Sequence, residues 1–206
     1  MRTLAVAILC VVVFTSLFSQ QPPNKPSPRT VAPLASGTIA DSVYRNSQLG
    51  ITYKIIFGWV DRTEQIRTNQ DKSSTGQVLL QVFEHPPEVK GEGINSAAII
   101  AAESLSAYPG VKTAADYLGP LIEAVTSQGF KVVNEPYQAN IGAKSLVRGD
   151  FSREVSGFTM HQSSLVMLSK GYAVSFTFIG SSEDEVQRLI ERLSFAAGKA
   201  GTKPLL

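Results

Sequence analysis

Residues 171–190, GYAVSFTFIGSSEDEVQRLI, contain the strand and the helix that decide the fold of this chain. Strand alternation places four large side chains on one face: Tyr172, Val174, Phe176 and Phe178. The opposite face carries the side chains of Ala173, Ser175, Thr177 and Ile179. Because this second face is also too apolar to be fully hydrated, we expect a central strand that is covered on both sides.

A helix is predicted directly after this strand. Ser182 and Glu185 have the spacing of a capping box, in which each residue satisfies a backbone N–H group of the first turn. Apolar side chains then recur at helical spacing: Val186, Leu189, Ile190 and Leu193. The charged residues between them occupy the other side, so this helix should pack on the sheet through one stripe.

Upstream of the central strand, the chain is typical of a run of antiparallel strands. We predict strands over residues 130–137, 141–151 and 158–168. Ser169-Lys170-Gly171 provides a tight hairpin turn into the central strand. These segments should therefore form neighbouring strands of one sheet.

A longer helix is predicted before these strands. Thr113 and Asp116 have capping-box spacing, and Gly129 suits the residue that follows a helix. The apolar side chains between them fall on one helical face. Pro120 lies inside this helix and should kink or split it, because proline removes one backbone hydrogen bond.

The N-terminal part of the domain is predicted to open with two strands joined by a turn at residues 46–50, the second strand closing at Phe57-Gly58-Trp59. Residues 60–70 have room for a helical turn or more. Residues 77–83 are predicted as a strand, and residues 85–93 as a loop because paired prolines interrupt a ladder. Residues 94–104 fit either a helix or a buried strand. The whole order predicts an α+β domain, a mostly antiparallel twisted sheet with helices packed on it.

The two ends of the chain are expected to lie outside this domain. Residues 1–20 have the charged start and short apolar run of a secretory signal peptide, and this run is shorter than the roughly 20 residues of a spanning helix. An uncleaved membrane anchor is the alternative. Residues 21–37 are predicted as a proline-rich spacer, 38–196 as a single domain and 197–206 as a flexible tail. We therefore expect an extracytoplasmic protein, periplasmic or secreted, that is tethered if the leader stays uncleaved.

Composition excludes several classes of mechanism. Cys10 is the only cysteine and lies in the leader, so the mature chain has no disulfide, no thiol chemistry and no cysteine-ligated metal. The 19 basic and 17 acidic residues nearly balance, which argues against nucleic-acid binding. No polybasic patch for anionic lipid is apparent either, and we expect no membrane insertion after signal cleavage.

Few residues are candidates for chemistry. His85 precedes two prolines in a predicted loop, and a metal contact through Glu84 and His85 is a minor alternative to a surface histidine. His161 lies in a predicted strand with Ser163 and Ser164, too close along that strand to form a relay by themselves. We therefore assign no catalytic, cofactor-binding or metal-binding residue.

Three other short patterns have a simpler structural interpretation. Gly91-Glu92-Gly93 lacks the lysine and hydroxyl residue of a phosphate-binding loop. Arg148-Gly149-Asp150 matches a cell-attachment tripeptide, but it falls in or beside a predicted strand rather than at a loop tip. Tyr53 and Trp59 are interpreted as core anchors rather than the lining of a pocket.

Several short stretches resemble PsbP-like domains, the family of the extrinsic photosystem II subunit and its bacterial relatives. These are Tyr44-x-Asn46, Leu49-Gly50-Ile51-x-Tyr53 and Gly58-Trp59, followed much later by the stretch 171–185. Ile56-Phe57 departs from the family, which usually has proline before Gly-Trp. The resemblance covers about residues 40–196. It implies an α/β/α sandwich that serves as a non-catalytic binding or assembly module.

Taken together, the sequence favours a non-enzymatic exported module that binds another envelope or exported protein. The alternative is a small exported hydrolase or ligand-binding protein whose site is formed only by the fold. A hollow with two converging titratable groups, and a histidine hydrogen-bonded there to a serine or carboxylate, would favour that alternative.

Overall fold

The computed structural model describes residues 34–69, 76–89, 91 and 93–196. The predicted signal peptide, most of the spacer and the predicted tail lie outside these residues. Two antiparallel sheets make up the fold. The smaller sheet has the order β1-β2-β3-β12, with β1 Thr38–Ala40, β2 Val43–Asn46, β3 Ile51–Lys54 and β12 Leu193–Phe195.

The larger sheet has eight strands in the order β4-β5-β6-β11-β10-β9-β7, and β8 also pairs with β9. Its strands are β4 Val60–Asp61, β5 Gly76–Phe83, β6 Ala97–Ser104, β7 Lys131–Val132, β8 Tyr137–Ile141, β9 Lys144–Val155, β10 Phe158–Ser169 and β11 Tyr172–Gly180. The helices are α1 Thr63–Asn69, α2 Ala114–Ser127 and α3 Glu183–Ile190, with a 3₁₀ turn η1 at Leu105–Ala107. The α+β class expected from the sequence is confirmed.

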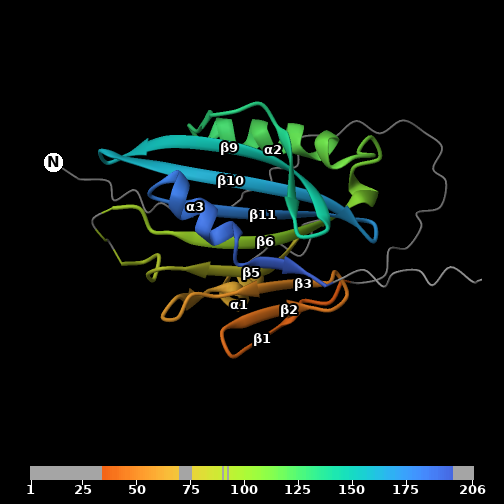
Figure 1. Cartoon of the computed structure of the whole chain (residues 1–206), viewed down its shortest axis with the longest axis horizontal. Coiled ribbons are helices and arrows are strands. Elements are labelled where there is room, and N and C mark those ends of the chain that lie inside the picture. The colour runs from red at the N-terminus through yellow and green to blue at the C-terminus, as the bar shows by residue number, and fades with distance from the viewer. Residues whose placement is uncertain (1–33, 70–75, 90, 92, 197–206) are drawn as a thin grey trace, which may run out of the picture.

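The larger sheet is covered on both faces (Figure 1). On one face, α3 and the smaller sheet enclose the larger core, to which β11 contributes Val174, Phe176 and Phe178. On the other face, α2 packs over a second core that includes Ala173 and Ile179 of the same strand. Because β11 lies between β6 and β10 and serves both cores, the predicted central strand is confirmed.

One predicted strand differs from the structure, and the structure decides one segment that the sequence left open. Residues 130–137 do not form one strand: β7 ends at Val132, and β8 begins only at Tyr137. Pro136 stands between them and has no N–H group to donate to a ladder. Residues 94–104, which the sequence left open, contain β6, because β5 and β11 pair with both of its edges.

The end of the last helix was also predicted differently. Leu193 does not continue α3 but begins β12, which pairs with β3 over Leu193↔Tyr53. The side chain of Leu193 still enters the larger core. Its apolar spacing therefore predicted its burial correctly, but not its strand conformation. Similarly, β3 ends at Lys54, and Phe57-Gly58-Trp59 belongs to a turn rather than a strand.

The predicted N-cap residues of α2 and α3 are confirmed, and each helix differs from its prediction in one other respect. In α2 the Thr113–Asp116 capping box is complete, and Gly129 has the positive φ of +87° that favours glycine after a helix. Pro120 does not split this helix, which runs unbroken from Ala114 to Ser127. In α3, Ser182 caps the amide of Glu185, but the Glu185 carboxylate accepts hydrogen bonds from Ser181 and Ser96 instead of completing the box.

The described chain begins with residues that the sequence had placed in the spacer. Leu34 is buried in the larger core. The Ala35 carbonyl accepts a hydrogen bond from Asn46, and the Ser36 carbonyl accepts one from Tyr44. The packed domain therefore extends to at least Leu34 rather than starting at Thr38. Within the described residues, no helix is long and apolar enough to cross a membrane.

Candidate functional site

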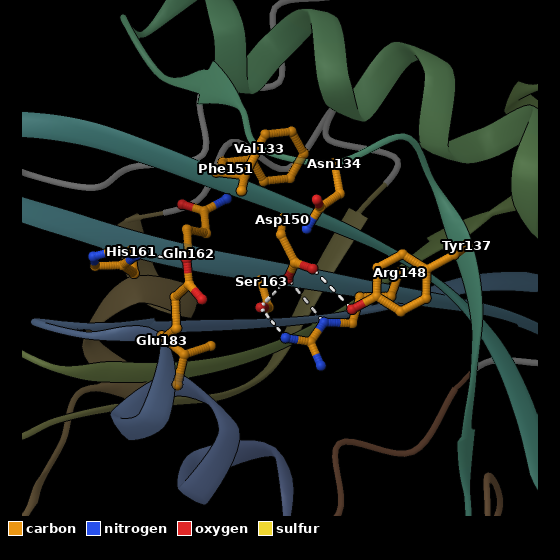
Figure 2. Close-up of a pocket in the computed structure, with 11 residues that line it drawn as sticks. Val133, Asn134, Tyr137, Arg148, Asp150, Phe151, His161, Gln162, Ser163 and Glu183 are labelled. Atoms are coloured by element: carbon orange, nitrogen blue, oxygen red, sulfur yellow. Dashed lines mark hydrogen bonds and ion pairs between the residues drawn. The ribbon is translucent and has the colours of Figure 1, made fainter.

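A hollow of about 160 Å³ lies on the α3 side of the larger sheet. Strands β9 and β10 form its floor, the first turn of α3 forms one wall, and the segment from β7 to β8 forms the other (Figure 2). Its lining is mostly polar: Asn134, Tyr137, Arg148, Asp150, His161, Gln162, Ser163 and Glu183, with Val133, Phe151 and Val186. We refer to it as the β9–α3 hollow.

An ion pair lies at the centre of this hollow. Arg148 Nε donates to Asp150 Oδ1 at 2.8 Å, and the two side chains retain only 16% and 14% of their exposure. Arg148 also donates to Ser163 Oγ at 3.0 Å and to Gln187 Oε1 at 3.0 Å. The other Asp150 oxygen accepts from the Tyr137 hydroxyl at 2.9 Å, and Ser163 donates to Asp150 as well.

Strand geometry explains why these side chains meet. Arg148 and Asp150 are two residues apart in β9, so both point to the same face of the sheet. Ser163 of β10 lies directly opposite Asp150 in the antiparallel register. Because the turn between β9 and β10 fixes that register, the cluster is a consequence of the hairpin.

The electrostatics of the cluster favour a charged aspartate. Burial alone would raise the pKa of Asp150, but hydrogen bonds from Ser163, Arg148 and Tyr137 outweigh it and hold this pKa below its usual range. Burial, together with the hydrogen bond to Asp150, raises the pKa of the Tyr137 hydroxyl. At neutral pH the ion pair is therefore fully formed and the tyrosine is neutral.

This arrangement does not activate Ser163 as a nucleophile. An activated serine needs a base that can accept its proton, and a carboxylate with a lowered pKa is a weak base. Arg148 also donates to the Ser163 oxygen, which engages a lone pair that an attack would need. The described neighbours of Ser163 therefore hold the hydroxyl in place rather than prepare it for acyl transfer.

His161 lines the same hollow, but it makes no hydrogen bond to the carboxylates there. Its Nδ1 atom lies 3.9 Å from Glu183 Oε1, which is beyond hydrogen-bond distance. Ser164 points to the opposite face, where its hydroxyl lies 3.4 Å from that of Thr177. The hollow thus brings titratable groups together as the hydrolase alternative requires, yet it lacks the histidine contact which that alternative also requires.

The other candidates from the sequence lie elsewhere. His85 is an exposed loop residue, 3.9 Å from Glu84. Tyr53 is a core residue with 1% exposure, and Trp59 packs partly against the same core, so both act as anchors. The Arg148-Gly149-Asp150 tripeptide lies within β9 with its charges paired to each other. Among the described residues, no three histidine, cysteine or acidic side chains are grouped to hold a metal.

Sequence reasoning singled out Arg148, Asp150 and Ser163 but did not join them. It also passed over Tyr137, Asn134 and Glu183. The first three could have been joined from the strand predictions, because Arg148 and Asp150 alternate onto one face and the hairpin register places Ser163 opposite Asp150. The others could not, because the β7–β8 segment and α3 are placed by tertiary packing.

Comparisons with known proteins give weak structural likenesses. No family model matches the chain, and no curated protein does. Cyanobacterial PsbP (CyanoP) from Synechocystis sp. PCC 6803 is 14% identical with a TM-score of 0.49, covering 78% of this chain and 96% of that one. LpqN, involved in cell envelope biogenesis of Mycobacterium tuberculosis, is 16% identical with a TM-score of 0.40, covering 71% and 83%.

A third solved structure is that of PA94, a protein of unknown function from Pseudomonas aeruginosa. It is 17% identical with a TM-score of 0.36, and the match covers 58% of this chain and 75% of that chain. A PsbP structure, from the family that the short sequence stretches resemble, is thus among these weak structural likenesses.

Proposed function

We propose that this chain is an exported, non-enzymatic binding or assembly module of the cell envelope, with a PsbP-like domain that contacts another protein. The observation that carries the proposal is the side chain of Phe57, which is 95% exposed. Burying a phenylalanine side chain typically contributes about 1.5–3 kcal/mol. An aromatic side chain held this far into solvent is therefore a strong anchor for a partner.

Phe57 stands on a well-defined turn. The Trp59 amide donates to the Ile56 carbonyl at 3.1 Å, and Gly58 has a φ of +85°. This hydrogen bond and the positive φ at the third position are typical of a type II turn. Trp59 and Ile56 pack against the larger core, so the turn is anchored on both sides while Phe57 projects. A side chain presented in this way loses little conformational freedom on binding.

Two further apolar side chains lie on loops at the same end of the larger sheet. Val89 is 60% exposed in the β5–β6 loop, and Phe158 is 49% exposed where the β9–β10 hairpin turns. These loops and the turn after β3 all project from one end of the molecule (Figure 1). We name Phe57, Val89 and Phe158 the tip residues.

Both ends of the described chain emerge at the opposite end. The Ala35 amide donates to Gln48 Oε1 at 2.7 Å, and the Ala196 amide donates to the Gly50 carbonyl at 2.8 Å. Both contacts are to the β2–β3 turn, while Phe57 follows the other end of β3. A tether on the N-terminal segment would therefore direct the tip residues away from the membrane. This geometry suits a module that reaches a partner from its anchor.

The β9–α3 hollow supports the non-enzymatic part of the proposal. Its serine is hydrogen-bonded to a weakly basic carboxylate, and its histidine lies 3.9 Å from the nearest acidic oxygen. These are not the relations that activate a nucleophile.

The test is site-specific photo-crosslinking in living cells that express the full chain with its own leader. A benzophenone amino acid replaces Phe57 in one strain and the exposed Ser47 of the β2–β3 turn in the other. We expect a discrete adduct from position 57 and none of that mass from position 47. A crosslinker placed on the identified partner should capture this chain in return.

The same experiment identifies failure. Phe57→Ser should lower reciprocal capture at least tenfold without changing the melting temperature, because an exposed residue contributes little to folding. The proposal is wrong if both positions give the same adducts, if position 57 gives none, or if Phe57→Ser leaves capture unchanged.

A further inference from the structure

The β9–α3 hollow has the chemistry of a binding site for a ligand other than the partner protein. We propose that it binds an uncharged, hydroxyl-rich ligand, a sugar ring, through the Arg148–Asp150 pair at its floor. This inference rests on the hollow alone and is independent of the tip residues.

The floor presents a donor and an acceptor side by side. Arg148 has five N–H groups, of which three donate to Asp150, Ser163 and Gln187 in the described chain, so two remain. Asp150 Oδ2 accepts from Tyr137 and retains a further lone pair. Two neighbouring hydroxyls match this pair, because one can donate to the carboxylate while the next accepts from the guanidinium.

The walls continue the same pattern. Asn134 has an amide that both donates and accepts, and His161 has a ring that does the same when neutral. Both side chains line the hollow from opposite sides of Asp150 (Figure 2). Tyr137 lies at the rim, with the Arg148 guanidinium carbon 5.7 Å from its ring centroid, and the residue is 41% exposed. The exposed part of the ring can pack against the carbon face of a sugar. Each feature suits a ligand whose hydroxyls point in several directions.

The size and charge of the hollow favour a sugar over a larger or an anionic ligand. The volume of about 160 Å³ is small, which favours one sugar ring over a larger ligand. Arg148 is neutralised by Asp150 at 2.8 Å, so it offers little net charge to a phosphate. Glu183 at the mouth would repel anions further.

The test is nuclear magnetic resonance of the ¹⁵N-labelled protein, with glucose, mannose, galactose and N-acetylglucosamine as probes. We expect at least one sugar to shift the Asn134 side-chain amide and the backbone amides of Gly149 and Gln162 in a saturable manner. Phosphate, citrate and spermidine serve as charged comparators. Asn134→Ala should weaken sugar binding at least fivefold. Asn140 is an exposed residue of β8 outside the lining, so Asn140→Ala should not change the affinity for the sugar.

The outcomes separate clearly. Saturable shifts confined to the hollow and weakened by Asn134→Ala support the proposal. Shifts from a charged comparator but no sugar, shifts spread over the surface, no shift from any probe, or equal effects of the two asparagine variants would overturn it. Asn134 follows β7 at one edge of the larger sheet, and Phe57 precedes β4 at the other edge. Loss of sugar binding in Asn134→Ala with unchanged crosslinking at position 57 therefore distinguishes this inference from the proposed function.

Discussion

Two carboxyl groups, the half-buried Asp150 and the buried Glu103, lie on opposite faces of the same sheet and have different hydrogen-bond surroundings. Asp150 of β9 faces the β9–α3 hollow and receives hydrogen bonds from Arg148, Ser163 and Tyr137. Glu103 of β6 faces the α2 side with 2% exposure. Neither of its oxygens has a well-formed hydrogen bond within the described residues.

The difference sets the charge of each group. Asp150 has a pKa below its usual range despite its burial, because its partners favour the ionised form. Burial raises the pKa of Glu103, and the nearby hydroxyls of Tyr108 and Tyr117 offset this only in part. Burial alone therefore does not decide whether a carboxylate stays charged in this fold. The hydrogen-bond donors around it do.

The two groups should consequently have opposite effects on the pH dependence of folding stability. Asp150 has a lowered pKa in the folded state, so its contribution is present above the pKa of the unfolded chain and is lost as the pH falls through the folded value. Glu103 has a raised pKa, so its contribution is complete in acid and is lost as the pH rises through the folded value.

Arg148→Ala tests the Asp150 side of this comparison and should have the largest effect. It removes the main cationic partner of a mostly buried carboxylate and leaves that charge unpaired. We expect a loss of about 3 kcal/mol in the free energy of unfolding, the lower end for a broken buried pair because some exposure remains. Urea denaturation at neutral pH measures it.

The matched control for this variant is Arg188→Ala, which removes an exposed arginine from α3. It should change stability by no more than about 0.5 kcal/mol. An equally small loss in Arg148→Ala would show that Asp150 does not depend on its ion pair. The contrast between the two carboxyl groups would then fail on this side.

Glu103→Gln tests the other side and should have a smaller effect of opposite sign. The amide keeps the shape of the side chain but has no charge to bury. At neutral pH we expect a gain of about 1–2 kcal/mol in stability. The gain should shrink as the pH is lowered and vanish in acid, where the carboxyl is protonated in both states. Urea midpoints over a pH series measure it.

A pH-independent gain would mean that ionisation of Glu103 is not the cause. A loss of stability at neutral pH would mean that its carboxylate is well stabilised after all. Either result would remove the contrast with Asp150. The exposed Glu183→Gln serves as the control for a general effect of removing one negative charge.

Much of this comparison was accessible from the sequence, and the rest was not. The Ser156-Gly157 turn at the centre of a hairpin pairs residues whose numbers have a constant sum, so Asp150 must face Ser163 once that turn is recognised. Arg148 then shares their face by alternation. The strands over residues 141–151 and 158–168 were predicted, so only the hairpin register was missing.

Other features depended on contacts between distant segments. The strand state of β6 followed from its two neighbours, because its alanine-rich sequence fits a helix equally well. Leu193 belongs to a strand and not to the helix because it pairs with Tyr53 of β3, next to the hydrogen bond from the Lys54 amide to the Arg192 carbonyl. The exposure of Phe57 could not be derived either, since a large apolar residue beside a strand is normally expected in the core.

Ser163→Ala gives the smallest expected effect and the sharpest measurement, because it alters one donor to Asp150 and leaves the ion pair in place. We expect a loss of about 0.5–1 kcal/mol in stability, typical of a single hydrogen bond. The pKa of Asp150 should rise, since the hydrogen bond from Ser163 favours the ionised form. A ¹³C-detected titration of the carboxyl carbon follows this directly. Ser164 lies on the opposite face, so Ser164→Ala should leave the titration of Asp150 unchanged. An unaltered pKa of Asp150 in Ser163→Ala would mean that Arg148 and Tyr137 alone hold Asp150 in its charged form.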